Sequence, residues 1–562
     1  MKKFRWQLLI LFLTGLVVGT LLILEKRGGI GQNGGLQPVS GGVYTEALVG
    51  SLKRLNPLLD SSNQVDRDVD RLIYSGILKF DSRGLAVPDL ANSVTVSQDG
   101  VIYSVQLKDK LEWHDGEPLT TADVAFTIDL MKSGDGFIAQ DLIDFWKAIK
   151  VVVLDERNMQ FVLPEAFSPF QDYLAFGILP EHILGEKTIS EISDSDFNLS
   201  PIGSGPYQFS EITVEDSIIT GITLKGFDQY AGTPPFIQEI VFRYYPNAQT
   251  AYQAYLDGFV QGVSEIPNNL LPAALVQPTL SIYSGRLPQI SMILLNLNDP
   301  GVPFFQVAEI REALLLGLNR QRLVNDVFNG QAIVANGVIF PESWAYMDGL
   351  ATVNYDLDQA ILLLKQSGYV VTGEEEPVRT KDNTVFKFVL SYPDDELHRK
   401  LAESIQADWK KLSLDVTLEP IPADVFVSEK LAPRAFQAAL VDLNLGSTPD
   451  PDPYPFWDLG QAATGQNYSQ WNNRLASDSI EQARVTTDFS ERTRLYHNFQ
   501  SIFAQELPSL PLYFPVYNYA VDSSFKGVSM GPLIDTSYRF ASVTSWFLTT
   551  RSAQADASSN GK

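Results

Sequence analysis

Apolar residues recur at helical spacing in several parts of the chain. Val65, Val69, Leu72, Ile73 and Ile77 lie three or four residues apart, or at multiples of that spacing, and they predict a helix over 66–77. Three further amphipathic stretches predict helices, at Glu309–Val327, Asp356–Gly368 and Leu397–Leu412. Gly368 stands where a helix commonly ends in a left-handed residue.

Other stretches favour strands. Short runs at Val43–Val49, Val101–Leu107 and Leu414–Glu419 have strand character, and Val151–Leu163 predicts a hairpin that turns near 155–158. A helix is predicted from Thr120 or Thr121 to 131, since hydroxyl residues begin it and an aspartate follows in its first turn. Strands and helices interleave without repeats, which predicts α/β domains rather than a solenoid or an all-β sandwich.

The N-terminus carries a long uncharged run. Residues 6–24, WQLLILFLTGLVVGTLLIL, follow three basic residues and would form a helix of about 28 Å, close to the thickness of a bilayer core. No small-x-small cleavage site follows, so we expect an uncleaved membrane anchor, with a long cleavable signal peptide as the alternative. A Gly-rich linker at 28–42 separates this segment from the rest, and the tail at 552–562 has the composition of a disordered segment.

Composition limits the function. The 562 residues carry a net charge of −25, and the first 27 contribute +4, which leaves −29 for the remainder. This acidic balance argues against a nucleic-acid partner, because phosphate backbones are bound by clusters of Lys and Arg. The chain has no cysteine, so disulfides, thiolate chemistry and a lipid attached through cysteine are excluded.

Motifs of catalysis and of metal binding are lacking. His114 has no second histidine or carboxylate at ligand spacing, so a structural role is favoured over a metal site. The stretch GSGPY at 203–207 lacks the Lys-Ser/Thr of a P-loop and is better suited to a chain crossing between lobes. No GxSxG or HExxH motif occurs. We therefore expect no enzyme, no cofactor and no metal.

Several motifs stand in a characteristic order along the chain. The longest is Arg71–Met131, which contains GLAVPDLANSV, SQDGVIYSVQL and WHDGEPLTTADVAF. Further motifs are PIGSGPYQF at 201–209, the segment 310–346, YDLDQAILLLKQSGY at 355–369 and LPSLPLYFP at 507–515. In sequence and order they resemble one family, the solute-binding proteins of family 5, which serve bacterial dipeptide and oligopeptide ABC importers. The resemblance spans about residues 43–548, and Val94 replaces the tryptophan usual in the family.

The resemblance implies a two-lobed α/β fold like that of periplasmic binding proteins, of type II in the large cluster with an inserted extra subdomain, closing about a hinged ligand cleft. Crossings between the lobes would lie near 294–298 and 514–519. The implied divisions are these: 1–27 anchor or signal, 28–42 linker, 43–80, 200–295 and 518–548 lobe I, 81–199 inserted subdomain, 296–517 lobe II, and 549–562 disordered tail.

The same resemblance implies a function: capture of peptides outside the cytoplasm by lobe closure, and delivery to an ABC permease powered by ATPase subunits. The protein would be a monomer held to the membrane by its N-terminal helix. An oligosaccharide or another small solute is the alternative ligand, because aromatic residues stack well on sugar rings. A membrane-tethered sensing or scaffold module without an importer is the alternative role.

In peptide-binding relatives an aspartate of a PDPD-like stretch binds the α-ammonium group. Here the stretch STPDPDPYPFW at 447–457 offers Asp450, with Asp452 as the competing choice. A rigid acidic surface turn is the alternative interpretation. Weaker candidates are Asn63 and Gln64, which match a lobe I loop that borders the ligand in relatives. Three aromatic residues could form walls of the pocket, although packing is the commoner role of aromatic side chains: Trp344, Tyr346 and Trp457.

Overall fold

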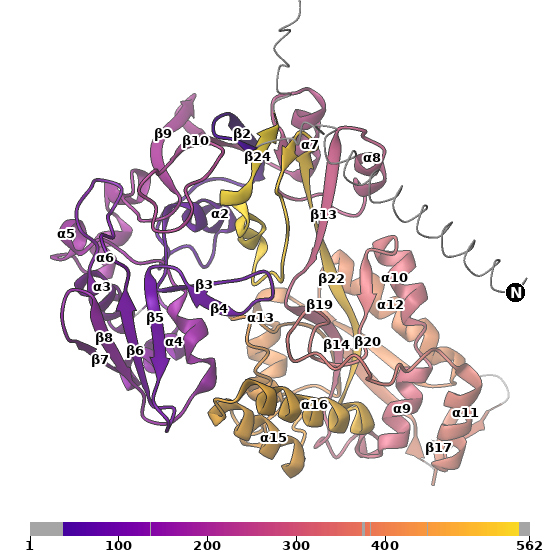
Figure 1. Cartoon of the computed structure of the whole chain (residues 1–562). Helices are drawn as coiled ribbons and strands as arrows, with labels where there is room; N and C mark the ends of the chain where they lie inside the picture. Colours follow the sequence, from indigo (N-terminus) through magenta and orange to yellow (C-terminus); the bar gives the residue numbers. More distant parts are fainter. Residues whose placement is uncertain (1–37, 135, 374–376, 383, 447, 550–562) are drawn as a thin grey trace, which may run out of the picture.

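The computed structural model describes residues 38–549, except residues 135, 374–376, 383 and 447. Two lobes and an inserted subdomain surround a central seam (Figure 1). Lobe I lies at the top of the view, the inserted subdomain at the lower left and lobe II at the lower right. The expected two-lobed α/β architecture is therefore present.

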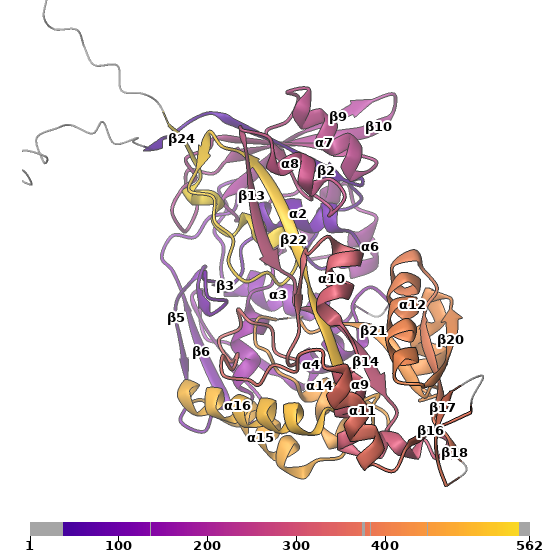
Figure 2. The same cartoon turned by 90° about the vertical axis from the view of Figure 1, so that its right-hand side faces the viewer.

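One long sheet runs through both lobes. Its strand order is β20-β19-β21-β14-β22-β12-β2-β11-β10-β9, and β13 and β15 also pair with β22. The long strand β22 (Ser509–Asp522) pairs with β14 in lobe II through its first residues and with β13 in lobe I through residues 516–522. Figure 2 shows β22 running from one lobe into the other. This strand is a covalent and hydrogen-bonded link between the lobes.

Lobe I packs its helices against strands of mixed direction: β2 is parallel to β11 and β12, whereas β9, β10 and β11 are antiparallel. Its elements are β1 (Pro38–Val39), β2 (Val43–Val49), α2 (Gln64–Ile73), β3 (Leu78–Phe80), β9 (Tyr207–Glu215), β10 (Ile218–Gly226), β11 (Glu239–Tyr245), α7 (Ala248–Leu256), β12 (Gly262–Val263), α8 (Leu271–Leu275), β13 (Leu280–Arg286), β23 (Phe525–Lys526), η6 (Thr536–Phe540), η7 (Val543–Ser545) and β24 (Phe547–Thr549).

The inserted subdomain is built on an antiparallel sheet of order β5-β6-β8-β7. Its hydrophobic core is continuous with that of lobe I, so the two pack against each other through one core. Its elements are β4 (Ala86–Pro88), β5 (Ala91–Val96), β6 (Ile102–Leu107), α3 (Thr121–Lys132), α4 (Gln140–Ala148), β7 (Lys150–Val153), β8 (Asn158–Val162), η1 (Ser168–Leu174), α5 (Glu181–Leu184), α6 (Ile189–Ser193) and η2 (Asp196–Leu199).

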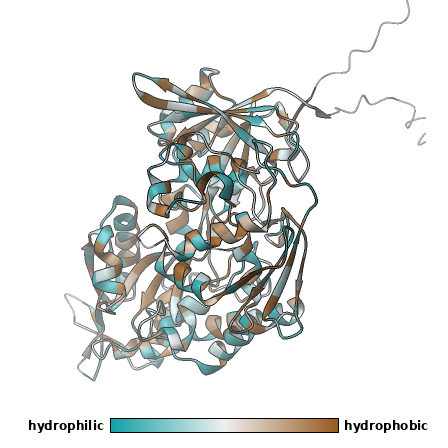
Figure 3. Cartoon of the chain, turned by 90° about the vertical axis from the view of Figure 1, so that its left-hand side faces the viewer, coloured by the Kyte–Doolittle hydropathy of each residue, from teal (hydrophilic) through white to brown (hydrophobic). Residues whose placement is uncertain are grey.

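Lobe II has separate cores, one under α9–α12 and one under α15 and α16. The outer helices carry both hydrophilic and hydrophobic residues (Figure 3), as amphipathic helices do. The elements are β14 (Gln289–Leu295), η3 (Pro303–Gln306), α9 (Ala308–Leu316), α10 (Arg320–Phe328), β15 (Ala332–Val334), α11 (Leu357–Gln366), β16 (Val370–Thr372), β17 (Val378–Lys381), β18 (Thr384–Val385), β19 (Lys387–Pro393), α12 (Glu396–Lys411), β20 (Asp415–Ile421), α13 (Ala423–Phe426), η4 (Val427–Leu431), β21 (Ala438–Asn444), α14 (Tyr454–Trp457), η5 (Leu459–Gln461), α15 (Arg474–Val485), α16 (Phe489–Glu506) and most of β22.

The chain crosses between the lobes at two neighbouring points. Strand β14 pairs with β21 along its whole length, from Gln289 to Leu295, and therefore belongs to lobe II. Strand β13 ends its pairing with β22 at Arg286, so the first crossing lies at 287–288. This is six or more residues before the expected crossing at 294–298. The second crossing lies near 515–516 of β22, inside the expected range of 514–519.

Local sequence patterns predicted most helices and strands, with ends that differ by a few residues from those in the structure. One predicted helix is instead two separate helices. Glu309–Val327 breaks after Leu316, and α10 begins after Asn319. The side chain of Asn319 caps α10 by accepting from the backbone N–H of Arg322, and its own N–H donates to Asp408 over 2.9 Å. A tertiary contact thus stabilises the break.

Within the described residues, no helix has both the length and the apolar character needed to cross a membrane. The predicted anchor at 6–24, most of the linker at 28–42 and most of the tail at 549–562 lie outside the described residues.

Candidate functional site

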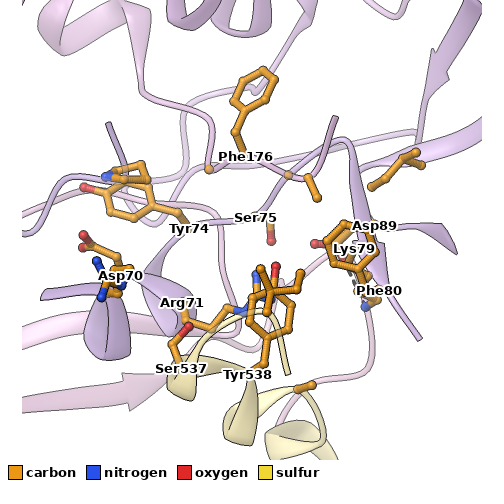
Figure 4. Close-up of a pocket in the computed structure, with 18 of the residues that line it drawn as sticks. Asp70, Arg71, Tyr74, Ser75, Lys79, Phe80, Asp89, Phe176, Ser537 and Tyr538 are labelled. Atoms are coloured by element: carbon orange, nitrogen blue, oxygen red, sulfur yellow. Dashed lines mark ion pairs between the residues drawn. The ribbon is translucent and has the colours of Figure 1, made fainter. Parts of the chain in front are cut away.

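A cavity of about 420 Å³ lies where lobe I, the inserted subdomain and lobe II meet. Helix α2 contributes Arg67, Asp70 and Arg71, and β3 contributes Lys79. The segment around η6 closes the cavity with Ser537 and Tyr538, whose side chains face those of α2 (Figure 4). Thr448 is the lobe II residue in its wall. We call this space the first cavity.

The first cavity is acidic and aromatic. Five carboxylates line it against three cationic side chains, together with eight aromatic rings. The carboxylates are Asp60, Asp70, Asp89, Asp172 and Asp535. Burial raises the pKa of Asp60 to about 8 and that of Asp172 to about 8. Such a lining suits a ligand that brings polar and apolar groups together.

A second cavity of about 610 Å³ adjoins the first and shares Leu142 and Tyr173 with it. The inserted subdomain and lobe II form its walls, with Phe145 and Phe167 on one side and Tyr454 on the other. These rings give the second cavity an aromatic lining.

Arg484 is the cation of the second cavity. Its guanidinium lies between the rings of Phe167 and Tyr454, 5.0 and 4.0 Å from their centroids. Its Nε is 3.0 Å from Oδ2 of Asp452. The side chain is therefore held in place by two rings and a carboxylate.

The proline-rich segment that the sequence singled out borders both cavities. Thr448 lines the first and Tyr454 lines the second, and Asp450 and Asp452 lie between these two residues in the chain. The backbone N–H of Asp450 donates to Oδ2 of Asp172 over 2.8 Å, which ties this segment to the inserted subdomain. The structure thus brings the predicted segment to the seam between the lobes.

The carboxylate of Asp450 already has partners within the protein. Its Oδ2 accepts from Nη2 of Arg492 at 2.6 Å, and its Oδ1 accepts from the hydroxyl of Tyr496 at 3.2 Å. Both members of the ion pair are buried, with side chains 5% and 9% exposed. An ammonium group that binds Asp450 would have to share or displace this pair.

Asp452 is partly buried in an ion pair with Arg484, and the two side chains are 15% and 29% exposed. Burial raises its pKa to about 6, against the opposing effect of that arginine. Asp452 contributes to a very small cavity of about 10 Å³, which Trp457 also lines. Asp452 therefore reaches the second cavity through Arg484 rather than by its own oxygens.

The other predicted residues occupy different places. Asn63 caps the start of α2 and Gln64 donates to Asp68 over 2.8 Å, so both shape the helix that carries Asp70. Neither lines the first or the second cavity. Trp457 is 2% exposed and packs edge-on against Phe503 in the core of lobe II.

Trp344 lines a third cavity, of about 530 Å³. Its ring lies 4.6 Å from that of Phe489 and 5.1 Å from the guanidinium of Arg492. Tyr346 contributes its carbonyl oxygen to a contact with His497. The contact of these residues with ligand stays a prediction.

His114 holds the glycine stretch. Its Nδ1 accepts from the N–H of Gly203, and its Nε2 lies 3.1 Å from the carbonyl oxygen of Gly205. Burial lowers its pKa to about 4, so the ring is neutral at pH 7. In the described part of the chain no three His, Asp or Glu side chains form a group suited to a metal ion. The prediction that the stretch 203–207 crosses between the lobes is wrong. It packs on the end of α2, where the N–H of Gly205 donates to the carbonyl oxygen of Ile73, and the crossings lie at 287–288 and near 515–516.

Sequence reasoning missed the residues that make the first cavity acidic. The helix that contains Asp70 was predicted, and its three aspartates at 66, 68 and 70 are a visible signal. Asp172 and Asp535 are separated from it by about 100 and 465 residues, and nothing in their local sequence marks them.

Comparison with known proteins decides the family. The model of the bacterial extracellular solute-binding proteins, family 5 Middle, matches residues 86–466, about two thirds of the chain. The chain belongs to this family. Proteins of this family bind solutes outside the cytoplasm.

Individual relatives cover nearly the whole chain. The dipeptide-binding protein of Escherichia coli K12 is 26% identical over 522 residues, 88% of this chain and 94% of its own. The structure of the oligopeptide-binding protein AppA of Bacillus subtilis in complex with a nonapeptide covers 92% of this chain and 100% of its own, with 24% identity and a TM-score of 0.67. HbpA2 of Haemophilus parasuis, 18% identical, reaches a TM-score of 0.79 over 91% of this chain and 100% of its own. These structures share the fold of the chain.

Proposed function

We propose that the protein is the substrate-binding component of an ABC importer and that its substrates are peptides. Relatives that cover most of the chain are named dipeptide-binding and oligopeptide-binding proteins. Among the structural neighbours are an ABC transporter substrate-binding protein of Listeria monocytogenes and a periplasmic binding protein of Helicobacter pylori in complex with the peptide STSA. The permease and ATPase subunits are its expected partners.

The observation that carries the proposal is the pair of adjoining cavities at the seam. Together they offer two adjoining spaces, each lined by charged and aromatic side chains, which share Leu142 and Tyr173. A peptide presents charged groups and apolar side chains a few ångströms apart along an extended backbone, so successive groups fit successive cavities. The prolines of the 448–454 segment favour extended backbone beside them.

Capture would proceed by closure of lobe II on lobe I. The two crossings, at 287–288 and near 515–516, are short and adjacent across the strand pair, which is the arrangement of a hinge. The seam already holds contacts between the inserted subdomain and lobe II, from Asp172 to the N–H of Asp450 and from Ser168 to the carbonyl of Thr486. Ligand in the cavities would add to these contacts and favour the closed form.

Asp450 as the partner of the α-ammonium group belongs to this proposal, with Asp452 as its competitor. Asp450→Asn tests it: affinity for free-amine peptides falls far more than affinity for their N-acetylated forms. Equal losses for the two forms would remove the assignment. Single substitutions in the same titrations test the other candidate ligand contacts, which are Trp344, Tyr346, Trp457, Asn63 and Gln64.

We also infer that the exported body is a monomer tethered to the cytoplasmic membrane by the helix at 6–24. Three basic residues precede this segment and two follow it, which favours retention of the N-terminal end on the cytoplasmic side. Terminal sequencing of protein from the membrane fraction tests this. A start at or near Met1 supports an uncleaved anchor, and a start between residues 28 and 42 shows processing.

A titration of purified protein with a mixed panel of short peptides tests the ligand class. Micromolar or tighter binding of several peptides, with no change in the peptides after incubation, supports capture without turnover. Binding of oligosaccharides in place of peptides would contradict the proposal.

A further inference from the structure

Four exposed apolar side chains lie on the two neighbouring helices α7 and α8 of lobe I. Leu256 and Phe259, at and just after the end of α7, are 45% and 60% exposed. Leu275 and Val276, at the end of α8, are 63% and 75% exposed. Figures 1 and 2 both draw α7 and α8 side by side. Single exposed apolar residues are normal on a protein surface, but several of them together indicate a contact surface.

Hydrogen bonds join the segments that carry these side chains. The hydroxyl of Tyr255 lies 2.8 Å from Oγ1 of Thr279. The N–H of Asp522 donates to the carbonyl oxygen of Gln261, and the next N–H along the chain, that of Ser523, donates to the carbonyl oxygen of Thr279. The segments that follow α7 and α8 therefore meet at the end of β22. We call the side chains of Leu256, Phe259, Leu275 and Val276 at this end of lobe I the apolar end.

The same part of lobe I carries little charge. The forty residues 246–285 contain two charged side chains, Asp257 and Glu265, whereas the chain average of 19% would give about eight. The chain without its first 27 residues has a net charge of −29. A membrane that contains anionic lipids repels acidic protein surface, so a poorly charged part of the body meets least repulsion there.

The described part of the chain begins at this end of lobe I. The N–H of Gln261, just after the apolar end, donates to the carbonyl oxygen of Thr45 in β2. Strand β1 precedes β2 and pairs with β24, which lies at the same end of lobe I as α7 and α8 (Figure 2).

A short stretch of sequence separates this end from the proposed anchor. Thirteen residues, 25–37, lie between the apolar run at 6–24 and Pro38. A stretch of this length spans at most about 45 Å, and about 20 Å on average if it is flexible. An anchor at 6–24 would therefore hold this end of lobe I close to the bilayer.

We propose that the apolar end of lobe I rests on the surface of the lipid bilayer that holds the anchor. The four apolar side chains enter the region between headgroups and acyl chains, and the more acidic remainder of the body faces away from the membrane. The anchor keeps this surface at a high local concentration beside the bilayer, so the contact needs little affinity of its own. The inference rests on the membrane tether of the proposed function and adds the face by which the body meets the membrane.

The test uses the full chain added to phosphatidylcholine vesicles that contain a lipid with a nitroxide near the top of its acyl chain. Because the chain has no cysteine, one introduced cysteine carries one fluorophore. Ala273→Cys places the fluorophore at an exposed position of α8, and Ala407→Cys places it at an exposed position of α12 in lobe II. Flotation measures how much chain binds the vesicles, and circular dichroism checks that the variants are folded.

The nitroxide lipid is expected to quench the label at 273 at least about threefold more than the label at 407, because interfacial apolar side chains enter about 5–10 Å into the boundary between headgroups and acyl chains. Phe259→Glu with Val276→Glu lowers the quenching at 273 to the level at 407. The matched control is Val370→Glu with Val371→Glu on β16 of lobe II, which are 49% and 48% exposed. This control leaves the quenching at 273 unchanged.

The contrary outcomes separate this surface from the tether. Equal quenching at the two labels, or quenching at neither in chains that float, overturns the inference and leaves the tether intact. A label at 273 that is already shielded without vesicles also overturns it. Such shielding assigns the apolar end to residues 1–37 if it is independent of protein concentration, and to a second copy of the chain if it grows with concentration. Failure of the chain to float removes the tether of the proposed function and the membrane surface with it.

Discussion

The buried pair between Asp450 and Arg492 gives a prediction whose size follows from the structure. Asp450→Asn removes the negative charge and leaves a guanidinium that is 9% exposed facing a neutral amide. Removal of one partner from a buried ion pair costs about 3–5 kcal/mol, and we expect about 3 kcal/mol here because Asn keeps one acceptor oxygen. Arg492 also keeps its bond to the carbonyl of Ala483.

The assay is urea unfolding of the exported body followed by tryptophan fluorescence. For a unit of the size of lobe II, the free energy of unfolding falls by about 3 kcal/mol per M urea. A loss of about 3 kcal/mol therefore lowers the midpoint of urea unfolding by about 1 M. Asp452→Asn is the matched control, since Arg484 is 29% exposed and stacked between rings; its loss is about 1 kcal/mol or less.

A double variant, Asp450→Leu with Arg492→Met, separates the charge from the packing. Replacement of both members of a buried pair by apolar residues is often neutral, so the double variant regains most of the stability lost by Asp450→Asn. An unchanged midpoint in Asp450→Asn would refute this reasoning, and would leave Asp450 free to act on the ligand alone.

Three further predictions concern packing, pH and closure. Gly203→Ala lowers the free energy of unfolding by about 3 kcal/mol, because the new Cβ would lie 2.0 Å from the carbonyl oxygen of Ile73 at the end of α2. The control Gly349→Ala places its Cβ in open space and changes the free energy of unfolding little. Equal effects of the two substitutions would contradict the close packing at Gly203. Burial alone would lower the pKa of His398, but Asp442 and Asp395 outweigh burial and raise that pKa above its ordinary value of 6.5. Protonated His398 therefore stabilises the fold fully below pH 6.5, and this stabilisation disappears as the pH rises through the folded-state pKa of His398. The difference in urea midpoint between wild type and His398→Gln measures this, and a difference that grows with pH would show the opposite sign. Saturating peptide lowers the radius of gyration measured by X-ray scattering, and a constant radius across the panel would argue against lobe closure.

Local chemistry explains why so much of the fold was predictable. The helix from Thr121 begins at the predicted hydroxyl residues, where Thr120 and Asp123 form a capping box. Helix α11 is capped by Asp356, and its C′ residue Gly368 is in a left-handed conformation. Strand β2 occupies the predicted Val43–Val49. Each of these signals lies within a few residues of the element that it specifies.

The site was less predictable because it is assembled from distant segments. Asp60 and Asp70 share the first cavity with Asp172 and Asp535, and only the sheet and the inserted subdomain bring them together. The partner of Asp450 was also hidden, since Arg492 is 42 residues away on α16. Sequence pattern identified the 447–457 segment, but the direction of each carboxylate depends on tertiary contacts.

Mass spectrometry of the ligand released from protein purified under native conditions tests the central claim most directly. The account predicts a mixture of short peptides that carry a free N-terminal amine. A sugar or a metal chelate as the dominant bound species would contradict it.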